Sequence, residues 1–243
     1  MEKGIVLQKY IAQSGFCSRR EAEALIATGK VKVDGRIAEL GKFVGKGEKV
    51  EIGHRVIDNA KKNIYIALNK PQGYTCSNRR FKGEKNIFEL IPINEKLFSI
   101  GRLDKESRGL LIITNDGELD NILSHPRFGH EKEYEVKVKG ISKDNEEEQI
   151  QEIKIKLEKG VDIGEGDGIV WAKKIRHLQN GKFIITLTTG KKRQIRRMLQ
   201  ALGLAVEDLR RISFAGLKIG SLAEGKWRYL DDKEVRELKK KRY

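Results

Sequence analysis

A short polar stretch at residues 58–63 divides this chain of 243 residues into two parts with different patterns. Its sequence, Asp-Asn-Ala-Lys-Lys-Asn, has neither helical nor alternating periodicity, and the apolar run that follows at residues 64–68 is typical of a buried strand. A chain of this length suits a small module followed by a larger domain. We therefore expect one domain at residues 1–60 and a second at residues 61–243.

The N-terminal part predicts two short helices followed by a β-hairpin. Apolar residues recur at helical spacing within residues 7–11 and again within residues 22–26. Ser18, with Glu21 three residues later, forms a capping box that would begin the second helix. Lys and Val alternate over residues 30–33, and the Asp-Gly pair that follows favours a tight hairpin turn.

The C-terminal part predicts an α+β domain built around a mixed, mostly antiparallel sheet. Helical segments lie between its strand-like ones, such as the apolar face of Leu119, Ile122 and Leu123. A glycine-rich run at residues 164–168 does not have the spacing of a nucleotide-binding loop and contains two carboxylates that would repel phosphate, so we expect a turn there. The strand-like segments span residues 100–103, 110–114, 133–139, 169–175 and 182–188.

The charge balance favours a polyanionic partner. The chain has 50 Lys and Arg against 35 Asp and Glu, a formal net charge of +15. Such an excess is typical of proteins that bind nucleic acid or a membrane surface. No apolar run approaches the roughly 18 residues of a membrane span, and the first residues lack the apolar core of a secretory signal. We therefore expect a cytoplasmic protein with no membrane association.

The cysteines and histidines do not indicate a metal site. Cys17 and Cys76 are far apart in the sequence, and the four histidines show no ligand spacing. We expect neither a disulfide framework nor a bound metal.

The order of residues in the N-terminal part resembles the S-four RNA-binding domain. The resemblance rests on Leu-Gln-Lys-Tyr-Ile-Ala at residues 7–12, Cys-Ser-Arg-Arg-Glu-Ala at residues 17–22 and Gly-Lys-Val-Lys-Val-Asp-Gly at residues 29–35. In that family the second helix and the adjoining loop bind RNA. The resemblance therefore implies a small S-four-type RNA-binding domain at residues 1–60.

Basic residues of this domain are candidates for contacts with RNA phosphates. The resemblance assigns Arg19 and Arg20 to this role by position, and Lys9 and Lys32 lie in the same basic cluster. Phosphate contacts would orient the RNA without reading its sequence. An ordinary solvated surface explains a cluster of charges equally well.

A second basic run, Lys-Lys-Arg-Gln-Ile-Arg-Arg at residues 191–197, follows a Thr-Thr-Gly turn and precedes an apolar helix face. The first turn of a helix presents free backbone N–H groups, which favour the binding of an anion. We expect Arg193 and Arg197 to contact RNA there. Ordinary solvated helix residues are the alternative.

The most specific motif surrounds Asp104. This residue lies in Ile-Gly-Arg-Leu-Asp-Lys-Glu-Ser-Arg-Gly-Leu-Leu at residues 100–111, where an Asp could simply cap a turn. Together with Thr-Asn-Asp-Gly at residues 114–117, this sequence resembles the signature loop of the ribosomal RNA pseudouridine synthases of the RsuA, RluB and RluF group. Three further blocks agree with that family in order, at residues 67–73, 131–134 and 193–198.

This second resemblance implies an enzyme and gives roles to individual residues. Asp104 matches the family's catalytic Asp, and Arg196 would balance its charge through two parallel hydrogen bonds. Tyr134 matches a tyrosine whose ring stacks on uracil, although a core tyrosine on a strand is the plain alternative. Arg102 would fill the space that the target base leaves when it flips out. Lys70, beside a proline, would help to shape the pocket.

The implied reaction is the isomerisation of a uridine to pseudouridine in ribosomal RNA, and the blocks favour the RluF branch, which acts on large-subunit RNA. The bond from N1 to C1′ breaks, the uracil turns, and C5 joins C1′, so neither a metal nor a redox cofactor is needed. Asp104 could attack C1′ or C6, or take the 2′ proton, and the sequence leaves these routes open. A tRNA as a second substrate stays open as well, and we expect a monomer.

Two other functions would explain part of the sequence. A non-catalytic RNA-binding protein accounts for the positive charge and the S-four blocks, but not for the blocks around Asp104, Tyr134 and Arg196. An RNA methyltransferase with the same N-terminal domain would need a glycine-rich loop directly after a strand to hold the methyl donor. No strand-like segment is followed by such a loop.

Overall fold

The computed structural model describes residues 4–58, 62–79, 81–142 and 144–240. The chain forms two compact units. The first comprises Met1–Ile64 with the short segments Asn94–Leu97 and Asn115–Gly117, and the second comprises the rest of the chain. The domain boundary expected between residues 60 and 61 lies outside the described residues, so the two expected domain ranges stay a prediction.

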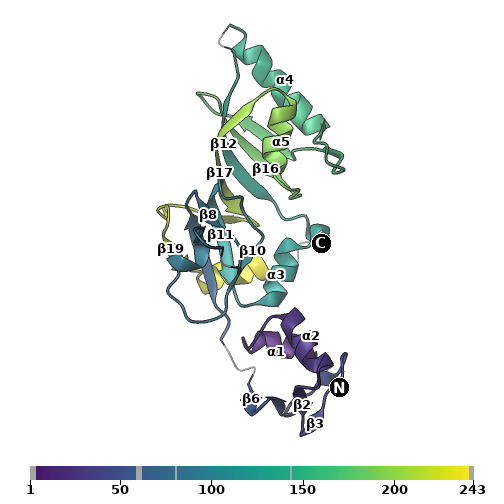
Figure 1. Ribbon diagram of the computed structural model, residues 1–243. Helices are drawn as coiled ribbons and strands as arrows, with labels where there is room; N and C mark the ends of the chain where they lie inside the picture. The colour runs from purple at the N-terminus through teal and green to yellow at the C-terminus, as the bar shows by residue number, and fades with distance from the viewer. Residues whose placement is uncertain (1–3, 59–61, 80, 143, 241–243) are drawn as a thin grey trace. The chain divides into compact units, whose positions relative to one another are not determined.

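The first unit packs two helices and a small antiparallel sheet around one core (Figure 1). Helix α1 spans Leu7–Gln13 and helix α2 spans Arg19–Ala27, and the apolar residues at helical spacing in both are buried in that core or packed against it. The expected helices and hairpin are therefore confirmed. The sheet has the order β3-β2-β5-β6, with strands at Arg36–Ile37, Val31–Val33, Val50–Ile52 and Arg55–Ile57, and β1 (Ile5–Val6) pairs separately with β4 (Phe43–Val44).

Local side-chain chemistry explains where the second helix and the hairpin begin. The Ser18 hydroxyl accepts a hydrogen bond from the Glu21 N–H at 3.3 Å, and the Glu21 carboxylate accepts one from the Ser18 N–H at 2.7 Å, which completes the capping box. Asp34 and Gly35 both adopt left-handed backbone, with φ of 49° and 76°. This conformation suits the two-residue turn that joins β2 to β3.

The second unit is built on a mixed sheet of nine strands. Its main path runs β15-β16-β12-β17-β11-β7-β19, while β10 pairs with β11 and β18 pairs with β17. Among the described strands of this sheet, only β11 and β17 are parallel neighbours, so the expected mostly antiparallel sheet is confirmed. The strands lie at Tyr65–Lys70 (β7), Phe98–Ile100 (β10), Arg108–Thr114 (β11), Lys132–Lys139 (β12), Lys174–His177 (β15), Lys182–Leu187 (β16), Ala205–Phe214 (β17), Leu217–Lys218 (β18) and Trp227–Tyr229 (β19).

Helices cover this sheet at two separate cores. Helices α4 (Glu146–Lys159) and α5 (Gln194–Ala201) pack against β12 and β16, and Figure 1 shows α5 directly beside these strands. Helices α3 (Gly117–Ser124) and α6 (Asp232–Lys239) contribute to a second core with β11. The described helices include none that is both long and apolar enough to cross a lipid bilayer. Short elements complete the unit, namely β8 (Tyr74–Thr75), β9 (Lys85–Asn86), β13 (Val161–Asp162), β14 (Ile169–Val170) and 3-10 turns at Ile87–Leu90 and Pro126–Phe128.

Two strand predictions were wrong in their bounds. The segment expected as one strand at residues 169–175 forms two strands, β14 and β15, which pair with different partners. The segment expected at residues 100–103 ends at Ile100, because the backbone then turns at Gly101 with φ of 66°. The turn expected at residues 164–168 is confirmed as the connection between β13 and β14.

Candidate active site

Asp104 lies half-buried in the loop that joins β10 to β11. The backbone of this loop is tied in place, because the Ser107 N–H donates to the Asp104 carbonyl at 3.0 Å and the Gly73 N–H donates to the Lys105 carbonyl at 2.8 Å. Asp104 therefore lies on a fixed loop at the start of β11, an interior strand of the sheet, rather than on a free surface turn.

Hydrogen bonds from the Lys70 side chain hold this loop in place. Lys70 ends β7, its side chain is fully buried, and its ammonium donates to the carbonyl oxygens of Asp104 at 3.1 Å and Ser107 at 2.6 Å. A further bond reaches the Pro71 carbonyl at 3.0 Å. Burial lowers the pKa of Lys70 below its ordinary value, and these carbonyls offset the cost of removing the ammonium from water. The contacts support the structural role expected for Lys70.

The strand that follows the Asp104 loop, β11, packs closely against its neighbour β17. A Cβ atom at Gly109 would lie 2.3 Å from the Arg211 carbonyl oxygen, so only glycine allows β11 to approach β17 this closely. Next to it, the Arg108 guanidinium holds the Asp208 carboxylate through two bonds, of 2.9 Å from Nε and 2.6 Å from Nη2. That guanidinium keeps the pKa of Asp208 below its usual value.

Arg196 reaches the Asp104 loop from α5. Its Nη2 donates to the Glu106 carbonyl at 3.2 Å and lies 3.4 Å from the Ser107 hydroxyl. Burial lowers the pKa of Arg196, while the charges of Glu106 and Asp104 raise it. Among the contacts of the described residues, none joins Arg196 directly to the Asp104 carboxylate. The structure thus brings Arg196 to the expected loop without forming the expected two-bond clamp, and the buried Nε of Arg196 has no hydrogen-bond partner.

Arg193 contacts the same loop at the start of α5. It caps the helix in left-handed backbone, with φ of 51°, and its Nη1 lies 2.9 Å from the Glu106 carboxylate. Buried Gln194 shapes the preceding turn, because its side-chain oxygen accepts bonds from the Thr189 hydroxyl at 3.1 Å and the Lys191 N–H at 3.0 Å. Arg193 and Arg196 therefore both hold the chain just after Asp104.

Arg197 faces away from this loop and binds the turn at residues 164–168. Its side chain is only 11% exposed, and its Nη1 lies 2.7 Å from the Asp167 carboxylate. The remaining nitrogens donate to the carbonyls of Ile163 at 2.9 Å and Gly164 at 2.6 Å. Because this guanidinium is already engaged, the geometry favours a structural role for Arg197 over the expected RNA contact.

The same acidic turn also meets the lysines of the basic run. Lys191 lies 3.4 Å from the Asp167 carboxylate, and Lys192 lies 3.8 Å from the Glu165 carboxylate. The basic run and the glycine-rich turn are separate features in the sequence. In the structure they form one charge-paired cluster, which reduces the positive charge available to an anion at this helix end.

Tyr134 lies half-buried on β12, with Ile185 and Arg211 as its neighbours on the flanking strands. Its ring packs at the edge of the core formed with α4 and α5. Gly109 is the other cross-strand neighbour of Arg211, so Tyr134 and Gly109 are two strand spacings apart, roughly 10 Å. The sheet therefore brings Tyr134 close to the strand that follows the Asp104 loop.

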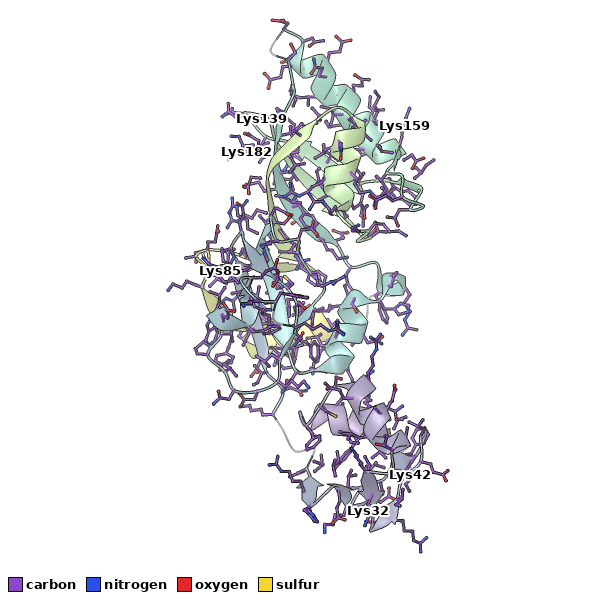
Figure 2. The ribbon with its side chains drawn as sticks, viewed as in Figure 1. Lys32, Lys42, Lys85, Lys139, Lys159 and Lys182 are labelled. Carbon is purple, nitrogen blue, oxygen red and sulfur yellow. The ribbon has the colours of Figure 1, made fainter. Side chains whose placement is uncertain are left out.

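The remaining predicted RNA-binding residues are accessible. Arg102 is exposed in the Asp104 loop, and Arg19 and Arg20 are exposed in the first turn of α2. Lys32 is exposed on β2, where Figure 2 labels it, and Lys9 is half-buried on α1. Exposure permits contact with RNA, and the RNA-binding roles of these residues stay predictions.

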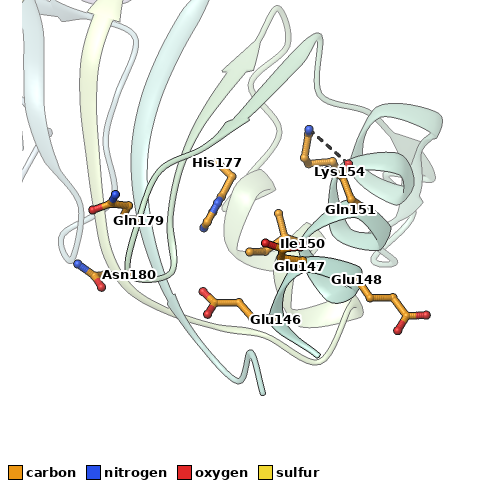
Figure 3. A pocket seen from close by; sticks show the side chains of 9 residues that line it. All are labelled: Glu146, Glu147, Glu148, Ile150, Gln151, Lys154, His177, Gln179 and Asn180. Atoms are coloured by element: carbon orange, nitrogen blue, oxygen red, sulfur yellow. Dashed lines mark hydrogen bonds between the residues drawn. The ribbon is translucent and has the colours of Figure 1, made fainter. Parts of the chain in front are cut away.

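A separate cavity of about 820 Å³ lies between α4 and the hairpin of β15 and β16. Its lining includes Glu146, Glu147 and Glu148 from the start of α4, which Figure 3 labels. None of the predicted site residues lines this cavity. Its negative charge would repel RNA, so we place the candidate active site at the Asp104 loop instead.

Sequence reasoning missed two residues beside Tyr134. Lys132 and Arg211 are basic residues withdrawn from water: Arg211 is 2% exposed, and burial lowers the pKa of Lys132 to about 8. The available signal was weak, since Lys132 precedes Tyr134 by two residues on an alternating strand and Arg211 is one of two adjacent arginines. Only the pairing of β12 with β17 brings them together.

The Asp104 loop is thus held by one buried cation, Lys70, and is contacted by two arginines at the start of α5, Arg193 and Arg196. The sequence of the chain matches the S4 domain over residues 7–61 and the RNA pseudouridylate synthase family over residues 64–201. The chain belongs to the RNA pseudouridylate synthases, which are isomerases. This membership confirms the expected family, fold class and type of enzyme.

Individual relatives cover nearly the whole chain. It is 37% identical to the ribosomal large subunit pseudouridine synthase B of Bacillus subtilis, over 96% of this chain and 95% of the relative. It is also 37% identical to the dual-specificity RNA pseudouridine synthase RluF of Escherichia coli, over 98% of this chain and 79% of the relative. A crystal structure of a pseudouridylate synthase matches with a TM-score of 0.68 and 27% identity, covering 97% of this chain and all of that one.

Proposed function

We propose that this enzyme converts a uridine of large-subunit ribosomal RNA into pseudouridine, with Asp104 as the catalytic carboxylate. The observation that carries the proposal is the fixed position of the Asp104 loop. Lys70 holds its backbone through hydrogen bonds, and Arg196 contacts it from α5. The large subunit as substrate is supported by the similarity to the ribosomal large subunit pseudouridine synthase B of B. subtilis. The E. coli relative is named a dual-specificity enzyme, so a second RNA should be tested as well, and tRNA is the one that the sequence leaves open.

The chemistry requires a base that is detached and rejoined without loss. The N1–C1′ bond breaks, C5 bonds to C1′, the hydrogen on C5 leaves, and N1 gains a proton. In the proposed site Asp104 attacks C1′ or C6, or takes the 2′ proton, and each route leaves the uracil free to turn. The ring of Tyr134 would stack on the uracil, and the positive charge of Arg196 would lie near the Asp104 loop.

Access to the base requires the uridine to leave its stack, at a cost of a few kcal/mol. Arg102 is exposed two residues before Asp104, and we propose that it occupies the vacated space. Arg19, Arg20, Lys9 and Lys32 would contact phosphates in the S4 domain. Arg193 would contact RNA at the start of α5 when it releases Glu106.

Ribosomal RNA as the substrate also suggests where the enzyme works. We propose a cytoplasmic protein, because the relatives come from bacteria, which assemble their ribosomes in the cytoplasm. We also propose a monomer, because each chain contains a complete set of proposed site residues. Light scattering during gel filtration would test the monomer directly.

The test of the proposal is release of tritium from RNA labelled at C5 of uridine. Wild-type enzyme should release tritium from a large-subunit ribosomal RNA transcript, because C5 exchanges its hydrogen for the bond to C1′. Asp104→Asn should release none while still binding the transcript. The matched control is Asp208→Asn, which alters a carboxylate held by Arg108 and should keep measurable release. Tritium release by Asp104→Asn at the wild-type rate would remove Asp104 from the mechanism.

A further inference from the structure

Two cations lie beside Tyr134 and belong to no role described so far. Lys132 begins β12, two residues before Tyr134, and Arg211 on β17 is the cross-strand neighbour of Tyr134. Both approach the buried ring of Phe214: the Lys132 Nζ lies 5.6 Å and the Arg211 Cζ lies 5.0 Å from its centroid. The strand register and the contacts with one aromatic ring therefore place both cations next to Phe214 and Tyr134.

Neither cation has a carboxylate partner among the described residues. Among the hydrogen-bond acceptors of the described residues, the Lys132 ammonium reaches the His130 carbonyl at 3.5 Å, which is a weak contact. The Arg211 guanidinium is 2% exposed and donates from Nε to the Leu110 carbonyl at 2.7 Å, while its buried Nη2 has no partner. The neighbouring Glu131 carboxylate is held 2.6 Å from Lys173 instead.

This arrangement costs the folded protein free energy. A guanidinium stays charged in any protein environment, and two cations withdrawn from water repel each other more strongly than they would in solvent. Burial and the charge of Arg211 together lower the pKa of Lys132 to about 8. A cluster kept at such a cost, next to a proposed active-site tyrosine, is typical of a binding site for an anion.

We propose that Lys132 and Arg211 form an anion subsite that receives a phosphodiester group of the RNA strand, next to the reacting uridine. The proposal rests on the proposed function, because RNA supplies the anion. Lys132 is partly exposed and makes the contact, while Arg211 stands behind it as a fixed positive charge. The phosphodiester carries a full negative charge before any bond breaks, so the subsite acts on binding and holds the strand while the base enters.

The test is RNA binding in a background that cannot react. Affinity for a large-subunit ribosomal RNA transcript is measured by fluorescence anisotropy at several salt concentrations, with Asp104→Asn as the reference. Adding Lys132→Met should weaken binding about tenfold or more, since charge-assisted hydrogen bonds contribute strongly. It should also lower the slope of log affinity against log salt by about one, because one fewer counterion is released.

Lys137→Met in the same background is the matched control. Lys137 lies on the same strand, but it is exposed and paired with Glu207 at 3.0 Å, so its loss should change affinity less than twofold. Lys132→Arg should keep most of the affinity and the salt slope. Lys132→Gln replaces Lys132→Met if circular dichroism shows that the methionine alters the fold.

Lys132→Met could leave affinity and salt slope unchanged in the Asp104→Asn background, yet slow turnover when Asp104 is intact. That result would overturn the subsite and assign Lys132 to the reacting base instead. An equal loss in Lys137→Met would also overturn it, because the effect would then be one of overall charge. The proposed function fails separately. Wild-type enzyme that binds the transcript without tritium release would contradict the proposed reaction, while the binding comparison would still decide the subsite.

Discussion

Replacing Lys132 with methionine should stabilise the second unit, although lysine at this position is proposed to bind RNA. Lysine and methionine have similar length, so the substitution keeps the packing against Phe214 and removes the charge that repels Arg211. Sites kept for binding are often less stable than they could be, and relieving them raises stability at the expense of function. The prediction therefore separates a functional lysine from a structural one.

The magnitude follows from the pKa of Lys132, which falls from an ordinary 10.5 to about 8. A difference of about 2.5 pKa units corresponds to roughly 3.4 kcal/mol at 1.36 kcal/mol per unit. Because the side chain is still partly exposed, solvent screening reduces the expected gain to about 1–2 kcal/mol. The penalty applies in full below pH 8, where the lysine is charged in both states, and it disappears as the pH rises to about 10.5.

Urea unfolding followed by tryptophan fluorescence measures this gain, because Trp171 and Trp227 both lie in the second unit. Lys132→Met should be more stable than wild type at pH 7, and the difference should shrink steadily between pH 8 and 10 with an unchanged m-value. Lys137→Met should show no such pH-dependent gain. A difference that stays constant with pH, or a loss of stability at pH 7, would refute the reasoning.

Three further substitutions test the anchoring of the site and of the S4 domain. Gly109→Ala should cost more than about 3 kcal/mol and abolish tritium release, because its Cβ would overlap the Arg211 carbonyl, and retained activity would contradict this tight approach. Arg197→Met should destabilise the second unit by about 2–4 kcal/mol in urea while the folded protein keeps its RNA affinity, and an affinity loss in anisotropy would restore Arg197 as an RNA contact. Ser18→Ala should lower the stability of the first unit by about 1 kcal/mol in thermal unfolding followed by circular dichroism, and no change would mean that the capping box contributes nothing there.

Local signals made the first unit predictable. Apolar spacing and the Ser18–Glu21 capping box predict its helices, and the Asp34–Gly35 turn predicts its hairpin. Each of these signals acts within a few residues of chain. Strand β17 was not predicted, because Arg211 occupies a buried position at which the alternating pattern of a strand would have an apolar residue. A charge at that position hides the pattern on which strand prediction depends.

The site was predictable only in part, for a related reason. Motif resemblance pointed to Asp104 and to Lys70, but it did not show that Lys70 binds backbone carbonyls 34 residues later in the chain. Arg197 looked like an RNA contact because the acidic turn that binds it lies some thirty residues away, with Asp167 at a separation of 30. Such long-range pairings depend on the sheet register, which the sequence pattern does not reveal.

The most direct test of the central claim is a pseudouridine map of ribosomal RNA by carbodiimide labelling and primer extension, from cells with and without this gene. We expect that one site in the large-subunit RNA is lost without the gene and returns with the wild-type gene, but not with Asp104→Asn. An unchanged map, or restoration by Asp104→Asn, would contradict that claim.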